Sequence, residues 1–221
     1  MLAKPERAEI NQYTMKLIVG LVAVLLPVLT NYFADLMESS ITSISESYWV
    51  GGWPESIFVG FLFAIASFLM AYNGTLAREM WLSKAAALAA VCVALFPCDC
   101  GGQPQIIPGL HYAAAGIMFA VLAYFCLIFL DRAQEKGHAE ARRRAMIYRV
   151  CAIGIVLSIA GLAYNGFTSE SISGRWDTFV YWVETLGLVS FGVSWLTASH
   201  TVPFTNNALE KHRPFAGLVQ S

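Results

Sequence analysis

Charged residues are scarce in this chain. Asp, Glu, Lys and Arg make up 13% of its 221 residues, about half of the roughly 25% found in an ordinary soluble domain. Hydrophobic residues make up 57%, which is more than one soluble core needs. The few charges cluster between long apolar runs instead of recurring on one face of amphipathic helices. This composition excludes an ordinary soluble domain and predicts a protein whose main partner is the lipid bilayer.

The chain also lacks an excess of basic residues and an even set of cysteines. Its net charge of -1 creates no field that would attract a polyanion, so we expect no nucleic-acid partner. Three of the five cysteines, Cys92, Cys126 and Cys151, lie in apolar runs, where cysteine behaves as a small buried hydrophobe. No disulfide framework is implied.

Six apolar segments approach the length of about 20 residues that a helix needs to cross a bilayer. They cover residues 13–33, 57–73, 84–97, 109–130, 145–164 and 176–197, and the third is the shortest. The pattern predicts an all-α, polytopic membrane helix bundle. We expect a six-helix transmembrane domain over residues 13–197, between tails formed by residues 1–12 and 198–221.

Basic residues are distributed unevenly between the two sides of this predicted bundle. Of the 14 lysines and arginines, all except Arg175 fall in the two tails, in the second and fourth connections, or at the ends of the spans that adjoin these segments. Positive charge marks the cytoplasmic side of a membrane protein. The distribution therefore predicts an even number of spans, with both termini in the cytoplasm and the chain in a cell membrane.

Acidic residues gather on the opposite, outer side. One explanation is that orientation by positive charge simply leaves acids outside, and the other is a mouth that attracts cations. Asn31 and Asp35 are four residues apart and so share a helix face, where they either line this mouth or cap the helix. The residues that we predict to line an outer pocket are Asn31, Asp35, Asp99 and Asp177.

Glu184 lies inside the last predicted span. It is about eight residues from the start, or roughly 12 Å deep at 1.5 Å per residue. An ionisable side chain at that depth is costly and marks a functional site or a partner inside the bundle. Two interpretations stay open: a catalytic or ligand-binding carboxylate, and a protonated Glu that hydrogen-bonds to a neighbouring helix.

His111 is the only histidine in or beside a predicted span. A helix-end histidine is commonly an interfacial hydrogen bonder, but Cys98, Asp99 and Cys100 lie on the same side of the membrane. If their helices adjoin, a zinc or copper site is possible with the ligands His111, Asp99, Cys98, Cys100 and Glu184. The spacing is not diagnostic, since H-E-x-x-H and paired CxxC motifs are absent. The Cys-x-Cys pair can be reduced, metal-bound or oxidised.

Several stretches resemble uncharacterised bacterial six-helix membrane proteins of the DUF998 and Frag1/DRAM/Sfk1-like families. They are SIS (43–45), FVG (58–60), VALFP (93–97), GLHY (109–112), WVETL (182–186) and FGVSWL (191–196). The resemblance implies a six-helix bundle in a bacterial inner membrane, with His111 and Glu184 belonging to the shared pattern. Cys98 departs from the hydroxyl residue usual after Phe-Pro, so no family-wide thiolate site is implied. The related ceramidase-like hydrolases use three zinc-binding histidines, which this chain lacks.

These features support three functional hypotheses. The first is a protein that handles a lipid or small ligand in an outward acidic pocket around His111 and Glu184. In a metal-assisted, catalytic form of this hypothesis, Glu184 is the general base or a ligand and His111 a ligand or acid. The second is an accessory subunit that packs against other membrane proteins through small-residue helix faces. The third is a transporter, motivated by the carboxylate of Glu184 within the membrane.

Overall fold

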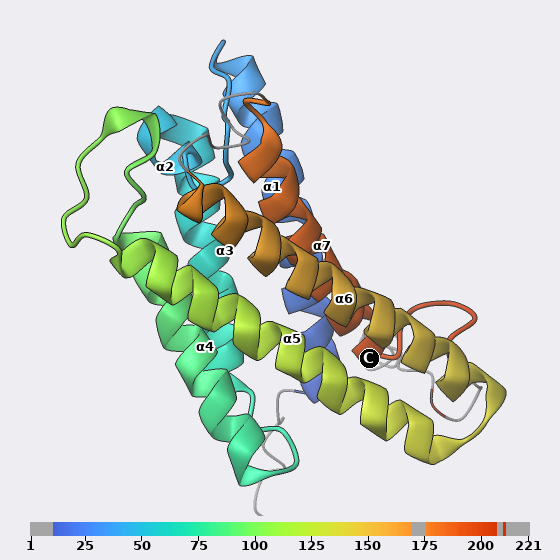
Figure 1. The fold of residues 1–221 in the computed structure, drawn as a ribbon. Helices are drawn as coiled ribbons and strands as arrows, with labels where there is room; N and C mark the ends of the chain where they lie inside the picture. Colours follow the sequence, from blue (N-terminus) through green and yellow to red (C-terminus); the bar gives the residue numbers. More distant parts are fainter. Residues whose placement is uncertain (1–10, 169–175, 207–209, 211–221) are drawn as a thin grey trace, which may run out of the picture.

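The computed structural model describes residues 11–168, 176–206 and 210 (Figure 1). This part of the chain is helical and contains no strand. The elements in chain order are α1 (Gln12–Leu36), α2 (Ser47–Val50), α3 (Gly52–Ala71), α4 (Ala77–Leu95), the 3-10 turn η1 (Cys100–Gly102), α5 (Leu110–Lys136), α6 (Ala139–Phe167) and α7 (Phe179–Ala198). The all-α helix bundle predicted from the sequence is confirmed.

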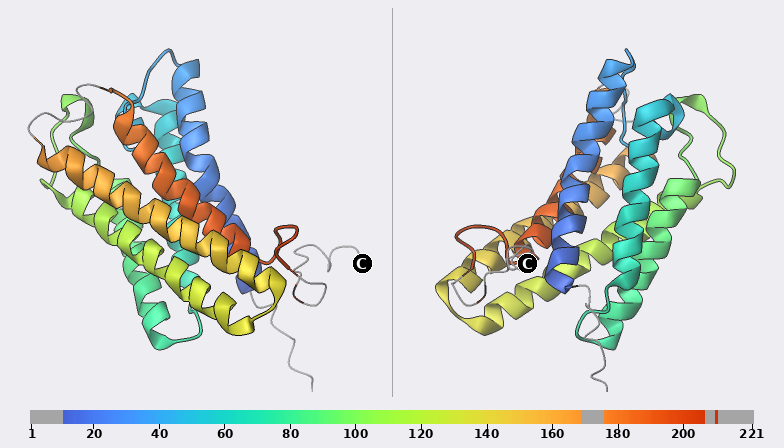
Figure 2. Two further views of the ribbon diagram at one scale, coloured as in Figure 1. Left: turned by 45° about the vertical axis from the view of Figure 1, so that its right-hand side comes forward. Right: turned by 180° about the vertical axis from the view of Figure 1, so that it is seen from behind.

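The six long helices are arranged in a ring that follows the order of the chain. Each packs against the next one, and α7 closes the ring by packing against α1. Successive helices run in opposite directions, as the views in Figure 2 show. The start of α1 and the α3–α4 and α5–α6 turns lie at one end, which we call the basic end. Loops 37–51 and 96–109 lie at the other end, which we call the loop end.

Five of the long helices are sufficiently long and apolar to cross a membrane: α1, α3, α5, α6 and α7. The remaining long helix, α4, is not among them, because Arg78, Glu79 and Lys84 make its first half polar. It nevertheless occupies its place in the ring between α3 and α5. A membrane bundle is therefore supported, while the sixth span and the orientation of the termini stay predictions.

A cluster of aromatic side chains fills the middle of the ring. Trp195 of α7 is fully buried, and its ring centroid lies 5.4 Å from Tyr72, 5.4 Å from Phe191, and 6.0 Å from both Phe125 and Phe129. Aromatic rings at these separations pack favourably in tilted and edge-to-face geometries. The cluster lies between two cavities, one toward each end of the bundle.

Two glycines allow α1 and α7 to approach closely at the point where the ring closes. A Cβ atom on Gly192 would lie 2.8 Å from the Gly20 carbonyl oxygen and 2.5 Å from a methyl group of Val24. A Cβ atom on Gly20 would lie 2.8 Å from the Gly192 carbonyl oxygen. Small residues at such contacts let helix backbones pack closely in membranes. The closure of the ring therefore depends on these two positions lacking a side chain.

We predict that Gly192→Val destabilises the bundle, because the new side chain must push α1 away from α7. Overpacking of this kind costs about 2 kcal/mol, which corresponds to a fall of roughly 5 °C in the thermal midpoint for a chain of this size. The measurement is the midpoint of heat-induced loss of the monodisperse peak in size-exclusion chromatography. Gly60→Val on α3 is the matched control, since nothing lies within 4 Å of its Cβ position. Equal midpoints for the two variants would contradict the prediction.

Candidate functional site

The loop that follows α1 folds inward at the loop end of the ring. Ile41 and Ile44 are buried in the main hydrophobic core, and Ser43 and Ser45 are buried beside them. The turn is closed by Glu46, whose Oε2 accepts hydrogen bonds from the backbone nitrogen of Thr42 at 2.6 Å and from its hydroxyl at 2.7 Å. This inserted loop brings hydroxyl groups and backbone N–H groups to the inside of a membrane-protein bundle.

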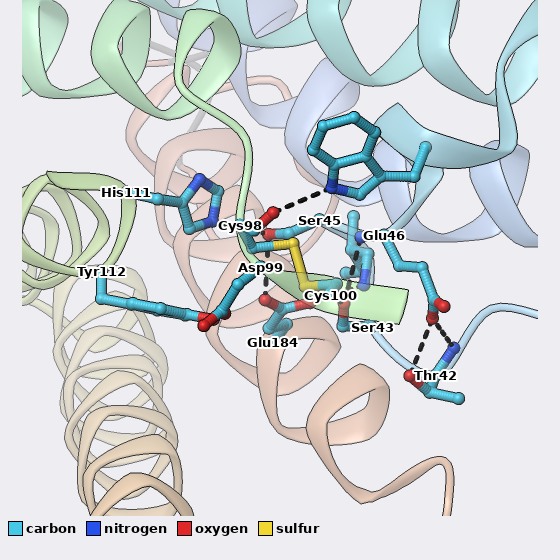
Figure 3. The surroundings of a disulfide bond; sticks show 12 residues. Thr42, Ser43, Ser45, Glu46, Cys98, Asp99, Cys100, His111, Tyr112 and Glu184 are labelled. Carbon is cyan, nitrogen blue, oxygen red and sulfur yellow. Dashed lines mark hydrogen bonds between the residues drawn. A yellow bond between two sulfur atoms is a disulfide. The ribbon is translucent and has the colours of Figure 1, made fainter. Parts of the chain in front are cut away.

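The carboxylate of Glu184 receives the inserted loop. Its Oε2 accepts a hydrogen bond from the Ile44 backbone nitrogen at 2.6 Å, and its Oε1 lies 3.1 Å from the Ser45 hydroxyl. Glu184 belongs to the second turn of α7 and is directed toward the loop, as Figure 3 shows. Glu184 is half-buried, and a carboxylate withdrawn from water is tolerated where hydrogen bonds compensate for the lost hydration. Both carboxylate oxygens here have such a partner.

His111 approaches the same serine from α5. Its Nε2 lies 3.1 Å from the Ser45 hydroxyl oxygen, and its Nδ1 lies 2.9 Å from the Phe96 carbonyl oxygen. The imidazole is 3% exposed, so these two contacts replace its hydration. Ser45 therefore bridges His111 and Glu184, two residues 73 positions apart, and Figure 3 shows the three side chains converging.

We call these three side chains the Glu184–Ser45–His111 bridge. The contacts Glu184–Ser45, Ser45–His111 and His111–Phe96 together determine how many protons the bridge holds. A carbonyl oxygen only accepts, so Nδ1 of His111 carries a proton and donates it to Phe96. The Ser45 hydroxyl has a single hydrogen to donate. If Ser45 donates to Glu184, then Nε2 must be protonated; if it donates to Nε2, then Glu184 must be protonated. Both arrangements contain one proton more than a neutral His111 together with an ionised Glu184 would hold.

The Cys98–Cys100 pair forms a disulfide in this structure. The segment is held by the Trp49 indole nitrogen, which donates to the Cys98 carbonyl oxygen at 2.8 Å. Asp99 between the two cysteines is exposed and accepts a hydrogen bond from the Tyr112 hydroxyl. Of the three forms left open by the sequence, the structure contains the oxidised one, shown in Figure 3.

The predicted metal ligands do not form a coordination group here. The thiols of Cys98 and Cys100 are bonded to each other, and the carboxylate of Asp99 is directed to Tyr112. Among the residues that the structure describes, no group of three or more His, Cys, Asp and Glu side chains is placed to hold a metal ion. His111 and Glu184, the predicted catalytic pair, are instead joined through a serine.

A cavity of about 690 Å³ opens beside the bridge, within the range of about 300–1,000 Å³ of small-molecule sites. Its polar side chains include Thr42, Ser43, Ser45, His111 and Glu184. Apolar side chains from all six long helices form most of the remaining wall; among them are Leu26, Phe58, Leu62, Val93, Met118, Phe119, Ile159 and Leu188. No lysine or arginine occurs among the described residues that line it.

The predicted outer-pocket residues are only partly brought to this cavity. Asp177 lines it, at its exposed rim. Asn31 and Asp35 do not line it, since they hydrogen-bond to each other at 3.1 Å on the outside of α1. Asp99 also lies outside the lining, although Cys98 and Cys100 on either side of it contribute. The acidic mouth expected from the sequence is thus reduced to Asp177 near Glu184.

We predict that two of the five cysteines are protected from alkylation until the protein is reduced. Cys92, Cys126 and Cys151 are free thiols, whereas Cys98 and Cys100 are joined. Iodoacetamide should therefore modify three cysteines in denatured, unreduced protein, and all of them after reduction. Intact-mass spectrometry measures both states. Modification of every cysteine without reduction would contradict the disulfide.

Comparison with protein-family models, with curated proteins and with solved structures found no match for this chain. The resemblance to the DUF998 and Frag1/DRAM/Sfk1-like families therefore stays a prediction from the quoted sequence stretches. What the protein does must be argued from the geometry of its own residues. The cavity and its Glu184–Ser45–His111 bridge are the features that carry this argument.

Proposed function

We propose that this chain is a six-span membrane protein that binds an uncharged amphipathic ligand, such as a lipid with a hydroxyl-bearing headgroup, in the loop-end cavity. The observation that carries the proposal is Ser45, which lies 3.1 Å from both His111 and Glu184 at the polar part of an otherwise apolar cavity. Ligand sites typically combine apolar walls with a few convergent polar groups. An apolar tail would contact the walls, while the headgroup would meet the bridge.

The charge of the lining favours an uncharged headgroup. The bridge holds one proton for its carboxylate and imidazole together, so it is neutral as a unit. Asp177 adds a negative charge at the rim, and no described lining residue is Lys or Arg. A phosphate or carboxylate headgroup would find no cation to pair with, and burial of an unpaired charge is costly. Hydroxyl and ester groups can instead exchange hydrogen bonds with Ser45 and Glu184.

The aromatic cluster around Trp195 supports binding over passage through the bundle. Along α7, Glu184 and Leu188 line the loop-end cavity, Phe191 and Trp195 are buried in the cluster, and Ala198 lines the other cavity. The two cavities are therefore separated by packed side chains. Neither transport nor an accessory-subunit role accounts for the bridge at the polar part of this cavity.

A second candidate function, acyl-ester hydrolysis, is favoured by one specific contact. The Ser45 hydroxyl lies at hydrogen-bond distance from Nε2 of His111, and the Phe96 carbonyl orients the imidazole. A serine activated by an oriented histidine is a common nucleophile for acyl transfer. A fluorophosphonate probe that labels the wild-type protein but not Ser45→Ala would support this activity. Absence of labelling in the wild type would count against it.

We predict that Glu184→Gln weakens ligand binding by about tenfold. The amide cannot exchange a proton with Ser45, and the loss of one hydrogen bond to a charged or protonated carboxyl group is worth about 1.4 kcal/mol or more. The measurement is binding of monooleoylglycerol to detergent-solubilised protein by native mass spectrometry. Leu188→Trp, which fills the cavity, should also reduce binding. Asp35→Asn is the matched control, since it makes the same chemical change outside the cavity. Binding by all variants that equals binding by the wild-type protein would contradict the proposal.

The proposed topology predicts opposite locations for the two ends of α4. Alkaline phosphatase fused after Pro104, in the loop before α5, should be active, because that end faces outward. Fusions after Thr75, in the α3–α4 turn, and at Ser221 should be inactive, because they stay in the cytoplasm. The readout is phosphatase activity normalised to fusion abundance. The same activity at Thr75 and Pro104 would mean that α4 does not cross the membrane.

A further inference from the structure

A second cavity, of about 420 Å³, lies at the basic end of the ring. It is formed by the start of α1, the α3–α4 turn, the last turns of α5, the first turns of α6 and the residues after α7. The described residues that line it include four basic side chains and no carboxylate: Lys16, Arg132, Lys136 and Arg144. This cavity plays no part in the function proposed above.

Two of these cations are buried and keep unused donors. Lys16 is 9% exposed, and the contacts of its ammonium with described residues are to aromatic rings, with its Nζ 5.1 Å from the Phe129 centroid and 5.6 Å from the Tyr72 centroid. Arg144 is 2% exposed, and its Nη2 is buried without a hydrogen-bond partner in the described residues. Buried charges are normally paired and hydrogen-bonded. Unpaired donors on two buried cations at one cavity therefore indicate a missing anion.

Nearby carboxylates neutralise the cavity only in part. Glu79 pairs with Arg132 at 2.5 Å. Glu210 pairs with Lys136 at 2.7 Å and with Arg144 at 2.9 Å. Among the described residues, the four cations that line the cavity are thus paired with two carboxylates, an excess of two positive charges. A phosphate group carries one to two negative charges at neutral pH, with three acceptor oxygens.

The pKa values of two groups outside the spans, His200 and Glu210, are shifted by the same positive charges. Burial and the charges of Arg144 and Lys136 lower the pKa of His200, which lines the cavity, to about 4. For Glu210, burial raises the pKa, but hydrogen bonds from Lys136 and Arg144 outweigh it and hold the pKa at about 2. The position of Glu210 shows that an oxyanion fits between these two cations.

We propose that the basic-end cavity is a binding site for a phosphate-type oxyanion, supplied either by the headgroup of an anionic lipid or by free phosphate. Lys16 and Nη2 of Arg144 donate from inside the cavity, and Lys136 and Arg132 contribute charge at its rim. Charge-assisted hydrogen bonds from lysine and arginine are the usual means of holding phosphate oxygens. The Glu210 carboxylate shares two of these cations and so competes with the ligand.

The test uses purified full-length protein and two separate probes. In the first arm, inorganic phosphate is titrated at constant ionic strength and binding is followed by calorimetry. In the second, the protein is reconstituted in phosphatidylcholine nanodiscs with or without 10% phosphatidate, and retained phosphatidate is counted by native mass spectrometry. Binding in the phosphate arm assigns the site to free phosphate. Binding only in the phosphatidate arm assigns it to a lipid headgroup.

Lys16→Met is the decisive variant, since it removes the charge while keeping an apolar stem, and Lys16 donates no hydrogen bond to a described residue. We expect its affinity to fall about tenfold, as for the loss of one charge-assisted hydrogen bond. Arg78→Met is the matched control, because Arg78 lies at the same end but outside the cavity. If Lys16→Met fails to fold, Lys136→Gln at the exposed rim replaces it. Absence of binding in both arms, or equal affinity of the cavity variant and the wild type, overturns the proposal.

Glu210→Gln tests the competing carboxylate independently. Removal of its charge should raise the affinity for the bound probe several-fold, because Lys136 and Arg144 then face the cavity without a resident anion. A fall in affinity would overturn the proposal, since it would mean that the carboxylate, and not the cations, holds the probe. Asp35→Asn at the loop end is the control for a general effect of charge.

Discussion

The hydrogen bonds between Glu184 and the loop after α1 are the interaction on which the loop end of this protein depends. The loop brings the Ile44 backbone nitrogen and the Ser45 hydroxyl among apolar helices, where an unpaired polar group costs about 1–3 kcal/mol. The Glu184 carboxyl group accepts a hydrogen bond from the Ile44 backbone nitrogen and shares one with the Ser45 hydroxyl. It thereby holds Ser45 against His111 and gives an apolar cavity its one polar wall. A carboxylate that looks unfavourable within a span is what allows the loop to enter the bundle.

The aromatic cluster around Trp195 divides the ring into two compartments with different chemistry. Toward the loop end, carboxylate, hydroxyl and imidazole share one proton and form a unit without net charge. Toward the basic end, cations outnumber carboxylates, and Lys16 rests on aromatic rings with no acceptor in the described residues. The same scaffold therefore favours an uncharged polar group at one end and an anion at the other. The loop end favours an uncharged group because its charges balance, and the basic end favours an anion because its cations are only partly paired.

Hydrophobic length and charge distribution were sufficient to predict the helices, but not where α4 begins. The predicted span started at Lys84, whereas α4 starts at Ala77, because the polar residues of its first half are satisfied by neighbours. Glu79 is buried against Arg132, and Lys84 donates to the Tyr72 carbonyl at 3.0 Å. A prediction based on apolar residues ends a span at the first charged residues. It cannot recognise that these charges are paired with groups outside the helix and can lie inside the bundle.

The site illustrates the same limit at the level of single residues. His111 and Glu184 are unusual in apolar surroundings, so the sequence identifies them without their partner. Ser45 is an ordinary loop serine by sequence, and only the inward fold of its loop brings it between them. Asn31 and Asp35 share a helix face as their spacing predicts, but that face points away from the cavity and the two side chains satisfy each other. Periodicity identifies which residues share a face, whereas the neighbours of that face are decided by packing. For this chain, the decisive packing event is the insertion of a loop that carries no sequence motif.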